Sequence, residues 1–253
     1  MERESMEYDV VIVGGGPAGL SCAIKLAQLT KENPLSICLL EKGSEIGAHI
    51  LSGNVFQTTA LDELIPDWKD KNAPLTTPVK KDKIMFLTKS SGISIPAFFM
   101  PPMNNHGNYI ISLGNLCRWL ATEAENLGIE IFPGFPASEL LYQDDKVIGV
   151  RTGDMGIDEN GEKKDSYEPG IDILAKYTIL SEGCRGHLGK EVISKYGLDN
   201  GKDPQHYGIG FKEIWKIKPE NHQEGLVMHT NGWPSPSDTP AGSYLYHGPN
   251  NEV

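Results

Sequence analysis

The chain has 253 residues, 39% hydrophobic and 23% charged, a composition typical of a globular protein rather than a disordered one. Its formal net charge of −11 argues against nucleic-acid binding, which depends on basic side chains at phosphates, and against a polybasic membrane anchor. No apolar run reaches the ~18 residues of a spanning helix, and the acidic residues 1–9 resemble no signal or transit peptide.

The four cysteines are far apart and include no CxxC pair. A zinc or iron–sulfur site built from this chain alone is therefore not expected, and separate thiols are typical of a reducing compartment. The cysteines are Cys22, Cys38, Cys117 and Cys184.

The first predicted element is a strand over 10–13, a short β-branched run of the kind buried in parallel sheets. The sequence GGGPAG follows at once and matches GxGxxG, and the apolar spacing after it predicts a helix over 17–29. A second strand is predicted over 37–40. This succession is typical of a dinucleotide-binding fold.

Each residue of the glycine motif has a physical role in such a fold. Gly14 permits a tight turn, Gly16 lets a pyrophosphate approach the backbone, and Gly19 lets the helix pack closely on the strand. Pro17 and Ala18 lie in the first turn of the helix, whose N–H groups attract a phosphate.

Glu41 ends the second predicted strand, 22 residues after Gly19, where a carboxylate accepts ribose hydroxyls. A dinucleotide is therefore expected. The spacing leaves FAD and NAD open, but a motif at the start of the chain with Pro17-Ala18 inside it resembles FAD-binding flavoproteins.

Loops with weak elements are predicted over 43–90. The loop after the second strand lies near the cofactor in a doubly wound fold, so the run GAHILSG, which contains Ser52 and Gly53, is a candidate flavin contact. The alternative is an ordinary surface loop.

Residues 90–117 contain no Asp, Glu, Lys or Arg. Inside this stretch lies the apolar segment 95–103. Its three prolines, Pro96, Pro101 and Pro102, forbid a continuous helix and disfavour a buried strand, which predicts an apolar loop there. Two interpretations stay open. The loop packs beneath another domain or lines an apolar pocket, or it is exposed and enters a membrane or meets a hydrophobic substrate.

A helix is predicted from Ser112, its N-cap, to about residue 127. On this helix, Arg118 is either a solvated charge or a contact of the flavin. Further strands are predicted over 130–132, 139–142, 147–152 and 171–180, with a hairpin at Asp144-Asp145.

The small, acidic turn at 181–186 follows the last of these strands and can face a cofactor. Residues 207–215, 225–229 and 243–246 predict antiparallel strands of a second layer or domain. His229 and His247, which follow such runs, are expected to be satisfied polar residues without a metal.

Several segments together resemble the electron-transfer flavoprotein:ubiquinone oxidoreductase family. They are DVVIVGGGPAGLSCAIKL, IPAFFMPPMNNHGNYIISLGNLCRWLATEAENLGIEIFPGFPASELLY, GVRTGDMGI, ILSEGCRG, YGIGFKEIW and GSYLYH. The resemblance implies FAD, a 4Fe-4S cluster, and electron transfer from reduced electron-transfer flavoprotein to ubiquinone on one membrane face. The cofactors carry such chemistry, so no catalytic side chain is expected.

The resemblance also implies the fold and its domains. The expected fold class is α/β, with a FAD-binding doubly wound (Rossmann-like) sheet, a β-meander and a partial second, antiparallel β quinone-binding domain. The expected FAD-binding domain covers 1–78 and 112–195, and the quinone or membrane-contact domain covers 79–111 and 196–253.

The site residues implied by the resemblance form two sets. The cofactor-binding set is Gly14, Gly16, Pro17, Ala18, Gly19, Glu41, Lys42, Ser52, Gly53, Arg118, Ala137, Glu182 and Gly183. The quinone or membrane set is Phe98, Phe99, Met100, Pro101, Met103, Ala241 and Gly242.

Two departures from the family are visible. Pro240-Ala241 stands where the family usually has Tyr-Gly, so Ala241 adds a methyl group near the expected quinone head group. The chain also ends at Val253 in what resembles mid-domain, so we expect the N-terminal half of a longer protein, with the cluster cysteines in its other half.

The expected location is peripheral, on the cytoplasmic face of a bacterial inner membrane or the matrix face of the mitochondrial one. Two alternatives stay open. One is another flavoenzyme of the same fold, such as a geranylgeranyl-reductase-like or hydroxylase-like protein, and the other is a non-catalytic flavin-binding fragment.

Overall fold

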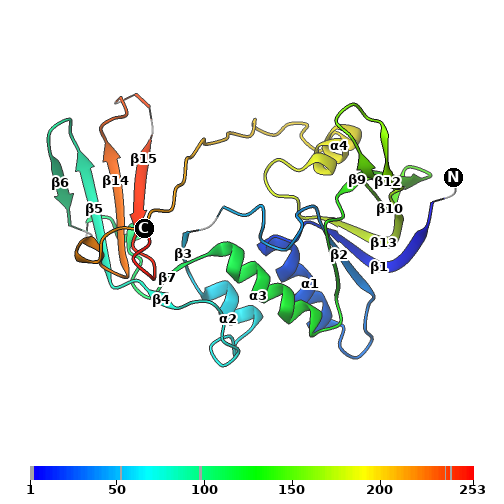
Figure 1. Cartoon of the computed structure of the whole chain (residues 1–253), viewed down its shortest axis with the longest axis horizontal. Coiled ribbons are helices and arrows are strands. Elements are labelled where there is room, and N and C mark those ends of the chain that lie inside the picture. The colour runs from blue at the N-terminus through cyan, green and yellow to red at the C-terminus, as the bar shows by residue number, and fades with distance from the viewer. Residues whose placement is uncertain (1–2, 52, 97–98, 237, 240) are drawn as a thin grey trace. The chain divides into compact units, whose positions relative to one another are not determined.

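The computed structural model describes residues 3–51, 53–96, 99–236, 238–239 and 241–253 (Figure 1). The chain divides into two compact units. The first unit is Met1–Ile50 with Cys117–Gly208, and the second unit is Leu51–Leu116 with Ile209–Val253. These bounds differ from the predicted domains, whose assignment to functions stays a prediction.

The first unit is built on a six-stranded sheet in the order β8-β2-β1-β13-β10-β9. Four strands run parallel, and β10 pairs antiparallel with both β13 and β9. The strands are β1 (Ser5–Val13), β2 (Ile37–Glu41), β8 (Glu130–Pro133), β9 (Ala137–Gln143), β10 (Lys146–Thr152) and β13 (Asp172–Leu180).

The parallel strands β1 and β2 are apolar over Val10–Val13 and Ile37–Leu40 because both of their faces are covered there. Val11, Ile12 and Leu39 are fully buried, as are Leu20 and Ile24 on α1 (Pro17–Leu29). Burial of each such side chain stabilises the fold by roughly 1.5–3 kcal/mol before the cost in entropy. The unit also contains most of α3 (Leu113–Glu125), the helix α4 (His187–Tyr196), and a hairpin formed by β11 (Met155–Ile157) and β12 (Lys163–Glu168).

The second unit contains two smaller sheets. A four-stranded sheet has the order β15-β14-β5-β6, and a three-stranded sheet has the order β3-β7-β4. The elements are β3 (Asn54–Phe56), α2 (Thr59–Leu64), β4 (Thr77–Pro78), β5 (Lys81–Leu87), β6 (Gly92–Ile95), β7 (Tyr109–Ile111), β14 (Leu226–Gly232) and β15 (Gly242–Tyr246), with short 3-10 helices at Pro101–Met103 and Pro219–Asn221.

The predicted elements of the first unit are confirmed, including the hairpin, where Asp144 and Asp145 have φ of 47° and 65°. The fold class is also confirmed, although the four-stranded sheet is mixed because β14 pairs with β5 in parallel. The loops predicted over 43–90 contain β3, α2, β4 and β5, and α4 was not predicted.

The strand predicted over 207–215 is wrong. Ile209 and Phe211 are 90% and 93% exposed. Within the described chain no β-ladder includes this segment, and only an isolated bridge, Lys216 with Glu252, follows it. The alternating apolar residues thus lack a partner strand. Among the helices of the described residues, none is long and apolar enough to cross a membrane.

Candidate functional site

Three loops of the first unit converge at one edge of its sheet. Because β1, β2 and β13 are parallel, their carboxyl ends lie together. The Gly14 N–H donates to the Leu40 carbonyl at 2.8 Å, and the Ser181 N–H donates to the Val13 carbonyl at 2.8 Å. The glycine turn therefore lies between the ends of β2 and β13.

The glycine turn has the close approaches that its spacing predicts. Gly14 has φ of +111°, and a Cβ there would lie 2.4 Å from the Ser181 carbonyl oxygen. A Cβ on Gly19 would lie 2.0 Å from the Gly14 carbonyl oxygen, so only glycine allows α1 to pack this closely. A Cβ on Gly16 would meet no atom within 4 Å, and this open side is where a pyrophosphate fits.

The N-terminus of α1 has the polarity that a phosphate needs. Gly16 is its N-cap and provides no side-chain cap, Pro17 occupies the first turn, and no acidic residue lies in that turn. The positive end of the helix dipole is therefore uncompensated by the helix itself. The exposed Lys42 follows β2 at the same edge of the sheet.

The Glu41 carboxylate is held by the backbone of the loops around it. Its Oε2 accepts a hydrogen bond from the Gly15 N–H at 2.9 Å, and its Oε1 accepts one from the Gly43 N–H at 2.7 Å. Each carboxylate oxygen has a further acceptor site, so ribose hydroxyls fit the same group. Sequence reasoning identified the acid but not these bonds.

The Glu182 carboxylate caps the N-terminus of α4. It accepts hydrogen bonds from the N–H groups of His187 at 3.0 Å, Leu188 at 3.1 Å and Gly189 at 2.8 Å. Gly183 follows it in the same turn. Because α4 was not predicted, this capping role was missed; an acid five residues before an amphipathic run is the signal that identifies it.

Two further predicted contacts have protein partners. The Arg118 guanidinium pairs with the Glu45 carboxylate at 3.0 Å, and both side chains are largely exposed. Ala137 begins β9 and packs against the apolar core of the first unit. Ser52 and Phe98 lie outside the described residues, and Gly53 belongs to the second unit, where its carbonyl accepts a bond from Lys212 Nζ at 2.8 Å.

The uncharged loop of the second unit is anchored by one polar residue. The Asn105 N–H and Nδ2 donate to Asp82 on β5 at 3.0 and 2.7 Å. Before this anchor, Met100 and Met103 are half-buried and Pro101 is exposed, while Phe99 is 68% exposed. Of the two interpretations of the loop, the exposed Phe99 favours the second.

The predicted quinone residues Ala241 and Gly242 lie at the start of β15. A Cβ on Gly242 would lie 2.7 Å from the Thr230 carbonyl oxygen, so the strand pairing requires glycine there. Ala241 is exposed, and its carbonyl accepts a hydrogen bond from Asn231 Nδ2 at 3.1 Å.

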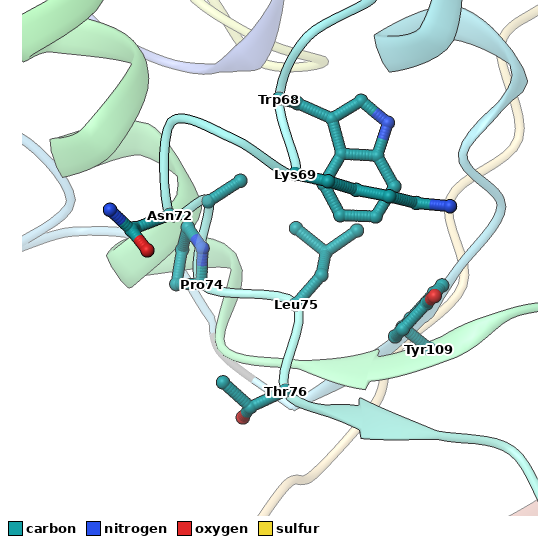
Figure 2. A pocket seen from close by; sticks show the side chains of 8 residues that line it. Trp68, Lys69, Asn72, Pro74, Leu75, Thr76 and Tyr109 are labelled. Carbon is teal, nitrogen blue, oxygen red and sulfur yellow. The ribbon is translucent and has the colours of Figure 1, made fainter.

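A shallow pocket of about 330 Å³ also lies in the second unit. Figure 2 shows Leu75 between the Trp68 ring and Tyr109, with Lys69 beside the indole. Its lining is Trp68, Lys69, Asn72, Ala73, Pro74, Leu75, Thr76 and Tyr109, and it includes no predicted site residue. The Trp68 indole N–H already donates to Asp62 at 2.7 Å, so the buried polar group beside this pocket is satisfied.

Buried thiols provide no nucleophile. Burial raises the pKa of Cys38 to about 12 and that of Cys117 to about 11, so both stay protonated at neutral pH. Within the described residues, no three His, Cys, Asp or Glu side chains gather as a metal site.

The parallel sheet, the glycine turn and α1 define the chain as an α/β protein with the FAD-binding Rossmann-like fold of flavoproteins. Residues 12–65 match the family described as "NAD(P)-binding Rossmann-like domain", whose glycine pattern FAD sites share. The fold resembles a geranylgeranyl bacteriochlorophyll reductase-like protein from Thermoplasma acidophilum, with a TM-score of 0.61, 18% identity, and coverage of 98% of this chain and 55% of that one. A flavoprotein/dehydrogenase from Cytophaga hutchinsonii matches with a TM-score of 0.52 and 16% identity, and the match covers 89% of this chain and 50% of that one.

The sequence relatives are more specific. The electron transfer flavoprotein-ubiquinone oxidoreductase of Pseudomonas aeruginosa is 57% identical over 259 residues, covering 100% of this chain and 47% of that protein. The human mitochondrial protein of the same name is 49% identical over 250 residues, which cover 98% of this chain and 40% of the human protein. Residues 207–253 match the family described as "ETF-QO, ubiquinone-binding". The chain is thus a homologue of the electron transfer flavoprotein-ubiquinone oxidoreductases, and it spans about half the length, or less, of these relatives.

Proposed function

We propose that this chain forms the FAD- and ubiquinone-binding portion of an enzyme that passes electrons from reduced electron-transfer flavoprotein to ubiquinone. The observation that supports this most strongly is the 57% identity to the Pseudomonas aeruginosa relative over 100% of this chain. The match of residues 207–253 to a ubiquinone-binding family supports the acceptor.

FAD, when bound, supplies the electron-transfer chemistry. The residues of this chain hold it. Gly16 and the N-terminus of α1 receive the pyrophosphate, and Glu41, oriented by two backbone N–H groups, accepts ribose hydroxyls. Lys42, Ser52, Gly53, Arg118, Ala137 and Gly183 stay proposed contacts, whereas Glu182 acts through the cap of α4.

The proposed location is the surface of a membrane, on the cytoplasmic face in a bacterium or the matrix face in a mitochondrion. Loop 98–103 is the proposed contact, because it carries no charge and exposes Phe99. We place the 4Fe-4S cluster outside these residues, since the cysteines lie in α1, β2, α3 and the turn after β13.

The test uses the FAD-loaded chain under anaerobic conditions. After photoreduction of the flavin, ubiquinone-1 is expected to reoxidise it within seconds. The complete Pseudomonas aeruginosa relative, with reduced electron-transfer flavoprotein as donor, is the positive control. Failure of ubiquinone-1 to reoxidise the flavin contradicts the proposal, as does rapid reduction of the flavin by NADH or NADPH, which points to another class of reductase.

A further inference from the structure

A hydrogen-bonded histidine and tyrosine lie on adjacent strands of the four-stranded sheet. His229 Nε2, from β14, is 3.0 Å from the Tyr246 hydroxyl oxygen of β15, and the ring centroids are 5.5 Å apart at 75°. Tyr244 stacks on Tyr246 with centroids 4.8 Å apart and an interplanar angle of 26°. The result is a small aromatic cluster with one polar pair.

The strand register shows which face carries this cluster. His229 pairs with Ile84 of β5 on one side and with Tyr244 on the other, and Phe86 pairs with Ile93. Paired residues point to the same side of a sheet, and alternate residues share a face. His229, both tyrosines, Ile84, Phe86 and Ile93 therefore lie on one face.

This face is buried at one end and open at the other. Val227 is fully buried against Val79 and Ile110, whereas Phe86 and Ile93 are 44% and 60% exposed. His229 is half-buried and lies between these regions. A planar, mostly apolar ring with polar oxygens fits such a face, because aromatic side chains pack on its plane and the polar pair meets an oxygen.

Two described residues, Asp82 and Tyr244, act electrostatically on the pair, and Lys212 lies near Tyr244. Burial lowers the pKa of His229, while the Asp82 carboxylate acts in the opposite direction. Burial, with Tyr244 adding to it, raises the pKa of Tyr246. Lys212 Nζ lies 5.4 Å from the centre of the Tyr244 ring. At neutral pH Tyr246 therefore keeps its hydroxyl proton beside a neutral imidazole.

We propose that His229 and Tyr246 deliver a proton to the quinone during its reduction, an inference that rests on the proposed function. Two electrons from that activity and two protons convert a quinone to a hydroquinone. The Tyr246 O–H bond breaks as the proton moves to a quinone oxygen, and the tyrosine regains a proton from His229 Nε2. Water protonates Nδ1 of the same ring as Nε2 gives up its proton, so the imidazole stays neutral and changes tautomer. Water also supplies the second proton to the quinone.

The test measures flavin reoxidation by ubiquinone-1 in the photoreduced, FAD-loaded chain, from pH 5.5 to 9 and in H₂O and D₂O. Tyr246→Phe removes the hydroxyl, and His229→Gln keeps a polar side chain without a titrating ring. Both variants are expected to slow reoxidation at least about 10-fold and to lose the solvent isotope effect. Tyr177→Phe, which removes the hydroxyl of a 70% exposed tyrosine on β13 of the first unit, is the matched control.

A second readout does not depend on turnover. Quenching of tryptophan fluorescence by ubiquinone-1 gives its Kd, which is expected to stay within twofold in all three variants. Fluorinated tyrosine at position 246 keeps the packing and lowers the hydroxyl pKa, so the pH profile of reoxidation is expected to shift to lower pH.

Rates of Tyr246→Phe and His229→Gln within twofold of the unmodified chain would overturn the inference, as would an equal loss in Tyr177→Phe. A pH profile of reoxidation that does not shift with fluorinated tyrosine at position 246 would also overturn the inference. If the unmodified chain does not reduce ubiquinone-1 at all, the proposed function itself fails, so the two failures are distinguishable.

Discussion

At the scale of single residues, backbone N–H groups orient the two acids at the ends of β2 and β13. Glu41 accepts from Gly15 and Gly43, and Glu182 accepts from three N–H groups of α4. Hydrogen bonds to charged groups contribute roughly 1.5–3 kcal/mol and fix the side-chain geometry. The Gly15–Glu41 hydrogen bond thus fixes the glycine turn, and the Glu182 bonds fix the start of α4, without a bound cofactor.

Substitutions at Gly16 and Gly19 are expected to affect different properties, cofactor binding at Gly16 and stability of the fold at Gly19. Gly19→Ala is expected to destabilise the first unit by about 1–3 kcal/mol, because its Cβ meets the Gly14 carbonyl at 2.0 Å. Gly16→Ala is expected to leave the midpoint of thermal unfolding nearly unchanged but to reduce bound FAD, since its Cβ projects into the open side. Thermal unfolding and flavin absorbance of the purified variants check both. Normal FAD content in Gly16→Ala would rule out phosphate approach at this position.

Asp9 makes stability depend on pH below 4. Hydrogen bonds from Lys176, with Nζ at 2.6 Å, and from Ser36 lower the pKa of Asp9 to about 2, whereas an unfolded aspartate titrates near ~3.9. Its contribution is therefore fully present above pH ~4 and is lost as the pH falls toward 2. Asp9→Asn is expected to have a lower unfolding midpoint than the unmodified chain at pH 6, with the difference vanishing near pH 2. The control is Asp165→Asn, an exposed position on β12; a difference that stays constant with pH would contradict the prediction.

At the scale of elements, α4 depends on a cap that comes from outside the helix. The N-cap residue, Gly186, has no side chain, so the first N–H groups of α4 rely on Glu182. This helix also covers part of β9, where His187 Nε2 lies 3.0 Å from the Ser138 carbonyl oxygen. Loss of the cap therefore affects the docking of a whole helix.

Glu182→Ala is expected to lower the free energy of unfolding by about 0.5–2 kcal/mol, the usual cost of removing a helix cap. Chemical denaturation at 25 °C measures it. The matched control, Glu159→Ala in the exposed turn between β11 and β12, is expected to change stability by less than about 0.5 kcal/mol. A FAD-free Glu182→Ala variant as stable as the unmodified chain would show that the cap contributes nothing.

At the scale of the whole molecule, an acidic chain with a net charge of −11 has an uncharged, partly exposed loop. With this charge, electrostatic attraction to anionic lipids contributes little, so the proposed membrane contact depends on apolar insertion of the loop. The loop anchor at Asp82 and Asn105 holds the base of this loop to β5.

Replacing Phe98 and Phe99 together with Asp is expected to weaken binding to liposomes at least about 10-fold, because each Phe contributes roughly 1.5–3 kcal/mol when buried. FAD content is expected to stay unchanged. Leu29→Asp, at a 71% exposed position ending α1, is the control for a charge added elsewhere. Co-sedimentation with neutral phosphatidylcholine vesicles measures the effect, and equal sedimentation of all variants would remove the membrane role of the loop.

Prediction from the sequence succeeded where elements are local and periodic. The run of β1, glycine turn, α1 and β2 depends on neighbouring residues, as do the Ser112 cap of α3 and the Asp144-Asp145 hairpin. It failed where pairing is non-local. The half-polar β5 is a strand because β14, far along the chain, pairs with it in parallel. By contrast, 207–215 alternates like a strand, but among the described residues only Trp215, at its end, has a backbone partner, Val253.

The sequence by itself determined the Rossmann-like class, the residues of the glycine turn and the family resemblance, because these depend on short-range spacing and on residue type. The tertiary structure alone decided the partners of the polar groups. Glu182 became a helix cap and His229 met Tyr246, since these contacts join strands and helices through register and packing, which no local pattern encodes.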